Sequence, residues 1–100
     1  MRLEFHPEAL AEYEDAAQHY AGCQKDLEIR FIAAIEAVLD QIAKNPEWGI
    51  ILEDDIRRWL ARIFPYAVLY SIESDYLLII AVMHCHREPG YWRYRLKTKA

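Results

Sequence analysis

The chain has 100 residues, 54% of them hydrophobic, and a formal net charge of −4 at pH 7. This size allows one domain with a modest core, and the low content of glycine and proline excludes a disordered or collagen-like chain. No apolar run approaches the roughly 20 residues that span a bilayer, and residues 1–7 lack the apolar core of a signal peptide. We therefore expect a single cytoplasmic domain over residues 1–100, with no membrane association.

The first half of the chain is predicted to form a short strand and two helices. Residues 2–6 alternate between polar and apolar, as in a strand, and Pro7 suits the first position of a helix that stops near Gly22. A second helix with a wide apolar stripe begins near Asp26 and ends at Asn45, because the residue before a proline avoids helical torsion angles. The short link between the helices predicts an antiparallel hairpin.

The second half of the chain is predicted to form strands. Residues 46–55 are interpreted as a loop in which Trp48 is a lid over the helical stripe rather than a platform for a ligand. Three strands follow, over residues 56–63, 66–72 and 76–83. The order β-α-α-β-β-β predicts an α+β domain of two layers, in which the helical hairpin packs on a small, mostly antiparallel sheet.

Charge is unevenly distributed along the chain. Thirteen of the sixteen acidic residues lie within residues 1–55, whereas residues 84–100 contain five cations and only Glu88 as an acid. A basic pole of this kind suits an anionic partner, and the acidic pole repels one. A solvated acidic helix surface with a frayed basic tail gives the same pattern, so both interpretations stay open.

The cysteines do not indicate a cofactor. Cys23 and Cys85 are expected to be free thiols of a reducing compartment. On an extended strand Cys85 points away from its neighbours His84 and His86, so these three side chains cannot share one zinc ion. We therefore expect neither a metal nor another cofactor.

Cations and aromatic rings gather where the last strand ends. Two histidines and Arg87 follow the apolar run, and Arg58 and Arg62 share one face of a regular strand, so the set suits a phosphodiester. RNA cleavage without a metal needs a base, an acid and a cation, and imidazole titrates near neutrality. If the chain is a nuclease, the expected catalytic residues are Arg58, Arg62, His84, His86, Arg87 and Tyr91.

Each of these residues also has a purely structural interpretation. The arginines can pair with the acids at residues 53–55, and a histidine at a strand end is commonly a hydrogen-bonding partner within the fold. Tyr91 and Trp92 can stack on a nucleic-acid base, but Trp92 can equally fold back and close the core over the sheet. The residues alone leave these alternatives open.

Five stretches occur in a characteristic order: residues 5–9 (FHPEA), 45–49 (NPEWG), 57–59 (RRW), 64–70 (FPYAVLY) and 84–95 (HCHREPGYWRYR). The ordered set, which covers nearly the whole chain, resembles the ParE branch of the RelE/ParE toxin superfamily. These proteins are the toxin half of bacterial toxin–antitoxin modules and include plasmid stabilisation proteins. The resemblance implies the same small sheet flanked by a helical hairpin.

The resemblance also implies partners. A small antitoxin packs a helix into grooves on the toxin and supplies the part that binds operator DNA. ParE-like members inhibit DNA gyrase by protein–protein contact, whereas RelE-like members cut messenger RNA on the ribosome without a metal. Here no lysine lies between Asn45 and Leu96 and the chain is acidic, which argues against broad capture of ribosomal RNA.

The leading hypothesis is therefore a gyrase-inhibiting toxin without catalytic chemistry. The alternatives are the messenger RNA endoribonuclease and a degenerate member that only binds an antitoxin, and the apolar helical stripes are also compatible with a homodimer. The residues expected to contact the target or the antitoxin are Arg58, Arg87, Tyr91, Trp92, Arg93 and Arg95.

Overall fold

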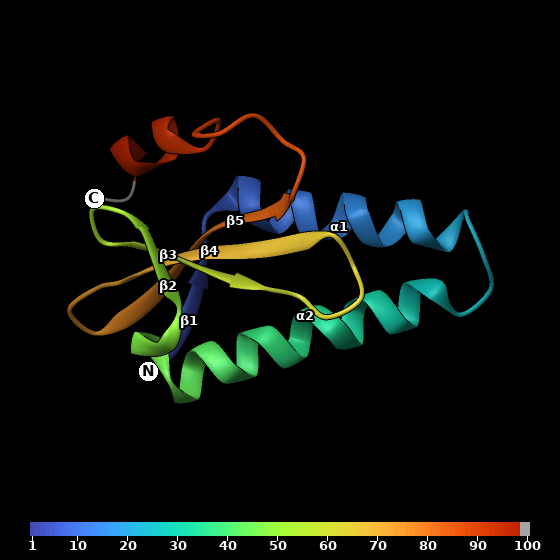
Figure 1. The fold of residues 1–100 in the computed structure, drawn as a ribbon, viewed down its shortest axis with the longest axis horizontal. Helices are drawn as coiled ribbons and strands as arrows, with labels where there is room; N and C mark the ends of the chain where they lie inside the picture. Colours follow the sequence, from blue (N-terminus) through green and yellow to red (C-terminus); the bar gives the residue numbers. More distant parts are fainter. Residues whose placement is uncertain (99–100) are drawn as a thin grey trace.

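A helical hairpin lies along one face of a five-stranded sheet, and the last part of the chain crosses the other face (Figure 1). The computed structural model describes residues 1–98. Its elements in chain order are β1 (Arg2–Phe5), α1 (Pro7–Ala21), α2 (Leu27–Lys44), η1 (Pro46–Trp48), β2 (Ile50–Glu53), β3 (Ile56–Leu60), β4 (Tyr66–Ile72), β5 (Tyr76–His84) and η2 (Arg93–Thr98), where η denotes a 3-10 helix. The predicted α+β fold is confirmed. Within the described residues, no helix is long and apolar enough to cross a bilayer.

The helix boundaries follow the predicted signals. His6 is the N-cap of α1, where its ring Nδ1 accepts a hydrogen bond from the backbone N–H of Glu8 at 3.1 Å. Pro7 occupies the first helical position, whose N–H would have no partner within the helix. Gly22 caps the C-terminus of α1, and Asn45 caps α2 just before Pro46. The sequence contained these signals because helix ends depend on local backbone chemistry.

The sheet has the strand order β1-β5-β4-β3-β2. β1 pairs in parallel with β5, and the other neighbours are antiparallel. The prediction that residues 46–55 form a loop is wrong in part, because Ile50–Glu53 pairs with β3 as an edge strand. The predicted strand over residues 56–63 is also too long: β3 ends at Leu60, and Ile63 has a φ of 75°, which no strand residue adopts.

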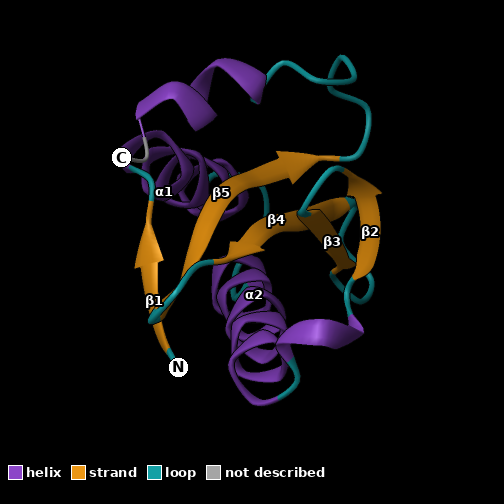
Figure 2. Cartoon of the chain, turned by 90° about the vertical axis from the view of Figure 1, so that its left-hand side faces the viewer, coloured by secondary structure: helices purple, strands orange, loops and turns teal. Residues whose placement is uncertain are grey.

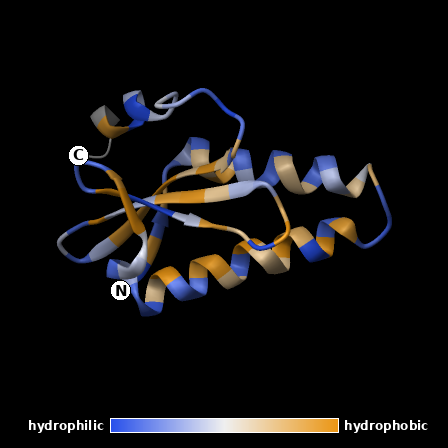
Figure 3. Ribbon diagram, viewed as in Figure 1, coloured by the Kyte–Doolittle hydropathy of each residue, from blue (hydrophilic) through white to orange (hydrophobic). Residues whose placement is uncertain are grey.

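Apolar residues form two clusters on opposite faces of the sheet. The larger cluster joins both helices to the sheet, with Phe31 and Ile35 of α2 at its centre. The smaller cluster lies on the other face and contains Trp92 from the C-terminal segment. Figure 2 shows the sheet between α2 and η2, and Figure 3 shows hydrophobic residues concentrated on the strands and α2. A strict two-layer arrangement would leave the second face of the sheet open to solvent. Here the C-terminal segment covers part of that face.

The turn before β2 is fixed from the centre of the sheet. The buried Tyr70 hydroxyl donates to the carbonyl of Pro46 at 2.7 Å and accepts from the N–H of Gly49 at 3.0 Å. A Cβ on Gly49 would lie 2.2 Å from that hydroxyl oxygen, so only glycine fits. Trp48, expected to be a lid over the helix, is instead 71% exposed and lines a shallow depression together with residues of β2 and β3.

Candidate functional site

An ion pair between α1 and the C-terminal segment completes the free edge of β5. β1 pairs only with residues 76–79 of β5, so the backbone beyond that point lacks a strand neighbour on this side. Glu12 Oε1 accepts from the N–H of Val82 at 3.0 Å, and Arg95 Nη1 donates to the carbonyl of Ile80 at 3.0 Å. Glu12 and Arg95 also bind each other through two hydrogen bonds of 2.8 and 2.9 Å. The pair thus occupies the position that a longer β1 would fill.

Tyr91 belongs to the same network. Its hydroxyl donates to Glu12 Oε2 at 2.5 Å, and its ring lies under the guanidinium of Arg87 at 4.0 Å and near that of Arg95 at 5.1 Å. Burial raises the pKa of the Tyr91 hydroxyl, and the hydrogen bond to the Glu12 carboxylate raises it further. A phenol held protonated in this way is unsuited to act as a general base near neutral pH.

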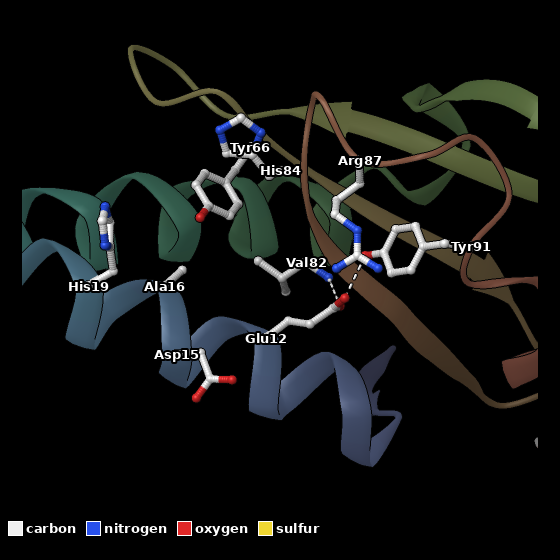
Figure 4. A pocket seen from close by; sticks show the side chains of 9 residues that line it. All are labelled: Glu12, Asp15, Ala16, His19, Tyr66, Val82, His84, Arg87 and Tyr91. Carbon is white, nitrogen blue, oxygen red and sulfur yellow. Dashed lines mark hydrogen bonds between the residues drawn. The ribbon is translucent and has the colours of Figure 1, made fainter.

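Beside Tyr91 lies a depression of about 250 Å³ between α1 and the end of β5 (Figure 4). His19 and Asp15 of α1 face it from one side, and His84 of β5 faces it from the other. The ring of His84 packs edge-on against Tyr66 at 5.2 Å, and its Nδ1 accepts the backbone N–H of His86 at 3.1 Å. These contacts orient the imidazole and leave its Nε2 for another partner.

A second depression of about 340 Å³ lies on the sheet face that carries Trp92. Arg58 of β3 and Arg87 both line it. Neither guanidinium makes a hydrogen bond or ion pair within the described part of the chain, and the Arg58 Nε atom is buried without a partner. A buried donor without an acceptor carries a desolvation cost that a bound anion would relieve. The depression is therefore suited to a carboxylate or a phosphate.

Arg93 closes one side of this second depression. Its guanidinium forms two hydrogen bonds with the Glu53 carboxylate of β2, at 2.8 and 2.6 Å, and this contact lowers the pKa of Glu53. Gly90 has a φ of 77°, and a Cβ there would lie 2.2 Å from the Arg93 guanidinium. The C-terminal segment therefore needs glycine at position 90 to reach Glu53.

The predicted site residues do not form one cluster. Arg58, Arg87 and Arg93 gather at the second depression, and His84 and Tyr91 line the first. Among the described residues, Arg87 alone lines both. The exposed ring of His86 lies 5.2 Å from that of His84. The remaining predicted residues are Arg62, Trp92 and Arg95.

Arg62 and Arg95 line neither depression, and Trp92 contributes only a buried wall to the second. Arg62 lies beyond the end of β3 in a groove against α2, so it does not join Arg58 as a regular strand would require. Trp92 is 1% exposed and Arg95 is 4% exposed. Trp92 therefore closes the core over the sheet, and both side chains are inaccessible to a partner in this arrangement.

The sequence interpretation missed the acids that organise the site. Glu12 holds Tyr91 and Arg95, Glu53 holds Arg93, and Asp15 with His19 lines the first depression. A signal was present on α1, since Glu8, Glu12, Asp15 and His19 follow the spacing of one helical face. A polar stripe beside an apolar one indicates that another polar segment packs there. Glu53 was predicted only as one of the acids at residues 53–55 that pair with Arg58 or Arg62, and its contact with Arg93 was not predicted.

The sequence matches the family described as "ParE toxin of type II toxin-antitoxin system, parDE" over residues 3–97. The chain belongs to the ParE toxin family. Its fold is similar to a solved structure titled "Chromosomal ParDE TA system from P. aeruginosa", with a TM-score of 0.62 and 12% sequence identity. The similarity covers 84% of this chain and 95% of that one, and at this identity it concerns the fold alone. No curated protein sequence matches the chain.

Membership in the ParE toxin family agrees with the resemblance found in the motifs. The matched region includes both depressions and the ion pair between Glu12 and Arg95. The segment from Glu88 to Arg95 resembles the C-terminal motif of the family. It is held against the domain by the buried Trp92 ring and by the bonds of Tyr91 and Arg95 to Glu12. Much of that ending is thus structural, and the accessible cations Arg87 and Arg93 are the part that a partner can reach.

Proposed function

We propose that this ParE family toxin stops bacterial growth in the cytoplasm by binding DNA gyrase, and that a small antitoxin neutralises it. The observation that carries the proposal is the family match over residues 3–97. The proposed target surface surrounds the second depression and contains Arg58, Arg87 and Arg93, with Tyr91 supporting Arg87 from below. Arginine is one of the residues most frequent among the hot spots of protein interfaces. A role in plasmid stabilisation follows from the same proposal.

Geometry favours contact over catalysis at this surface. A nuclease mechanism with His84 as acid or base and Arg58 as the cation requires both groups at one phosphate. They line separate depressions that share only Arg87, and the Tyr91 hydroxyl is engaged by Glu12. This separation supports the proposal of a non-catalytic toxin.

The endoribonuclease remains the second candidate because of one observation. Arg58, whose buried Nε has no hydrogen-bond partner, lines the same depression as Arg87, and two guanidiniums without hydrogen-bonded partners among the described residues suit a phosphodiester. On that hypothesis the target is messenger RNA on the ribosome, and His84 supplies the proton transfer.

The test follows DNA and protein synthesis by pulse labelling just after induction in a bacterial host. Gyrase inhibition predicts that DNA synthesis falls first and that the purified chain blocks supercoiling by purified gyrase. Arg87→Ala should weaken this block at least tenfold, since a hot-spot truncation costs about 2 kcal/mol or more. Lys25→Ala removes one charge from the exposed turn between the helices and is the matched control. An early fall in protein synthesis, with RNA cleavage that persists in EDTA, would instead establish the nuclease.

A further inference from the structure

The outer edge of the sheet at β2 is not protected against the addition of another strand (Figure 2). β2 is the last strand in the order β1-β5-β4-β3-β2, so no strand among residues 1–98 pairs with its outer side. Proteins commonly guard such an edge with charged side chains or with proline. Here the first three residues of β2 are Ile50, Ile51 and Leu52, with exposed fractions of 63%, 59% and 41%. The edge therefore presents backbone groups without a strand partner between apolar side chains, an arrangement that accepts another strand.

Two more exposed side chains extend this apolar surface. Trp48 lies just before β2 and is 71% exposed, and Leu60 at the end of β3 is 53% exposed. Both line a third depression, of about 270 Å³, together with Ile50. Five of the eleven exposed large hydrophobic residues within the described part of the chain thus gather at this edge. In strand recognition the backbone supplies affinity, and depressions for alternate side chains supply specificity.

Arg58 adds a positive charge to the same edge. Ile50 and Arg58 are directly opposite each other in the pairing of β2 with β3, so their side chains share one face of the sheet. Arg58 lines both the third depression and the second, and its buried Nε has no hydrogen-bond partner. A strand added beside β2 would lie about 10 Å from β3, which is two strand spacings. Because an arginine and a glutamate side chain together cover that distance, an acidic residue of the added strand can bind Arg58.

We propose that the β2 edge receives an extended segment of the target protein, which adds a sixth strand to the five-stranded sheet. The segment is mainly apolar. One acidic side chain, on the face that it shares with Ile50, binds Arg58, and a neighbouring apolar side chain packs on Trp48 in the third depression. That the partner is the target rests on the proposed function. The added strand continues the target surface around Arg58, Arg87 and Arg93, because Leu52 lines the second depression.

A second copy of this chain is a poorer occupant of the edge. Two copies related by a two-fold axis would pair their β2 strands antiparallel. Glu47, before β2 in one copy, would then lie beside Asp54, after β2 in the other, and the same contact would occur twice. Like charges opposite each other destabilise a strand pair. β2 is also short, and its pairing with β3 is irregular between Ile51 and Glu53, so backbone pairing covers few residues. The side chains of the partner must therefore supply much of the affinity, which favours a segment with a suitably placed acid.

The first test uses the purified chain with purified gyrase. Hydrogen–deuterium exchange of the chain is compared with and without gyrase, and we expect slower exchange at residues 48–53 in the complex. Ile51→Lys places a charge on the edge and should weaken gyrase binding at least tenfold in surface plasmon resonance. Ile29→Lys is the matched control, because this isoleucine of α2 is 64% exposed and lies outside the edge, so its binding should be unchanged. Both variants should melt at the wild-type temperature, since both side chains are exposed.

The second test needs no gyrase. Synthetic strand peptides of about ten residues, with alternating valine and threonine, carry either glutamate or lysine at the centre, and their binding to the purified chain is measured by fluorescence anisotropy. The acidic peptide should bind at least tenfold more tightly, and Arg58→Gln should remove this preference. Two further forms of the acidic peptide carry N-methyl groups along one edge or along the other. Only one edge can pair with β2 while the glutamate faces Arg58, so one methylated form should bind at least tenfold more weakly than the other.

The outcomes separate this proposal from the proposed function. Equal binding of the two methylated forms, equal binding of the acidic and lysine peptides, or no peptide binding to the folded chain would overturn the strand edge. A dimer in analytical ultracentrifugation, with slow exchange at residues 48–53 in the chain alone, would assign the edge to a second copy instead. If gyrase binds without protecting these residues and Ile51→Lys has no effect, the proposed function stands and the edge proposal is wrong. If the peptides bind as described but gyrase does not bind, the proposed target is wrong and the strand edge stands.

Discussion

Glu12 and Arg95 form a largely enclosed ion pair whose two members also satisfy the backbone of β5, at Val82 and Ile80. The pair joins the first helix to the end of the chain and supports Tyr91 between them. Because Tyr91 in turn lies under Arg87, the position of this accessible cation depends on the Glu12 carboxylate of α1. Stability and the geometry of the surface are therefore linked.

Breaking this ion pair should destabilise the domain strongly. Glu12→Leu or Arg95→Leu leaves the other charge enclosed without its partner, so each should lower the free energy of unfolding by about 3–5 kcal/mol. The double variant should cost less than the sum of the two by roughly 1–3 kcal/mol, since neither charge remains to be stranded. Urea unfolding of the four proteins measures this coupling. Strictly additive effects would contradict the direct pairing.

Tyr91 should make stability depend on pH in alkaline solution. Its pKa is raised in the folded state, first by burial and then by the hydrogen bond to Glu12. The stabilisation is thus complete below the unfolded pKa of about 10 and is lost as the pH rises towards the folded value. The difference in unfolding free energy between wild type and Tyr91→Phe should be constant near neutral pH and shrink above about pH 10. A difference that is flat across that range would exclude the proposed linkage.

The Tyr70 hydroxyl should contribute measurably to stability. Tyr70→Phe removes the donor to Pro46 and the acceptor for Gly49, leaving both backbone groups without a partner, at a cost of about 1–3 kcal/mol. Tyr76→Phe is the matched control, because that half-buried hydroxyl makes no hydrogen bond within the described residues. Thermal unfolding of the two variants gives the comparison. Equal melting temperatures would show that the turn is held by other contacts.

The two tryptophans at opposite extremes of exposure should behave differently. Trp92→Ala removes a ring that is fully enclosed on the sheet and should cost about 3–5 kcal/mol. Trp48→Ala changes an exposed ring and should stay within about 0.5 kcal/mol of the wild type. Denaturant titrations check both values. If the Trp92→Ala variant no longer arrests growth, we expect the cause to be unfolding rather than the loss of a contact with the target. A circular dichroism spectrum of the variant checks whether it is folded.

Local signals predicted the helices and most of the sheet, but not its edges. Pro7, Gly22 and the Asn45–Pro46 pair determine helix ends through neighbouring backbone groups, so the sequence contains their effect directly. β2 was missed because an edge strand buries little on either face, so Ile50–Glu53 shows no alternation of apolar and polar residues. The pairing of β2 with β3 is a tertiary contact that no local sequence pattern indicates.

The candidate site was predictable in its cations and not in its geometry. The arginines and histidines of residues 84–95 were found because of their density. Their division between two faces depends on the path of residues 85–92 after β5, which is fixed by Trp92, Gly90 and the acids on α1 and β2. Arg62 was misplaced because spacing along an assumed strand ignores the turn at Ile63.

The partners in the Glu12–Arg95 ion pair are 83 positions apart in sequence, and β1 has only β5, near the end of the chain, as its neighbour. A nascent chain still on the ribosome therefore cannot form the β1–β5 pairing before residues 76–79 are made, nor the ion pair before Arg95 is made. The surface around Arg87 forms only after residue 95 has left the exit tunnel. Synthesis thus imposes a delay between translation of the first residue and the appearance of a chain able to recognise its target.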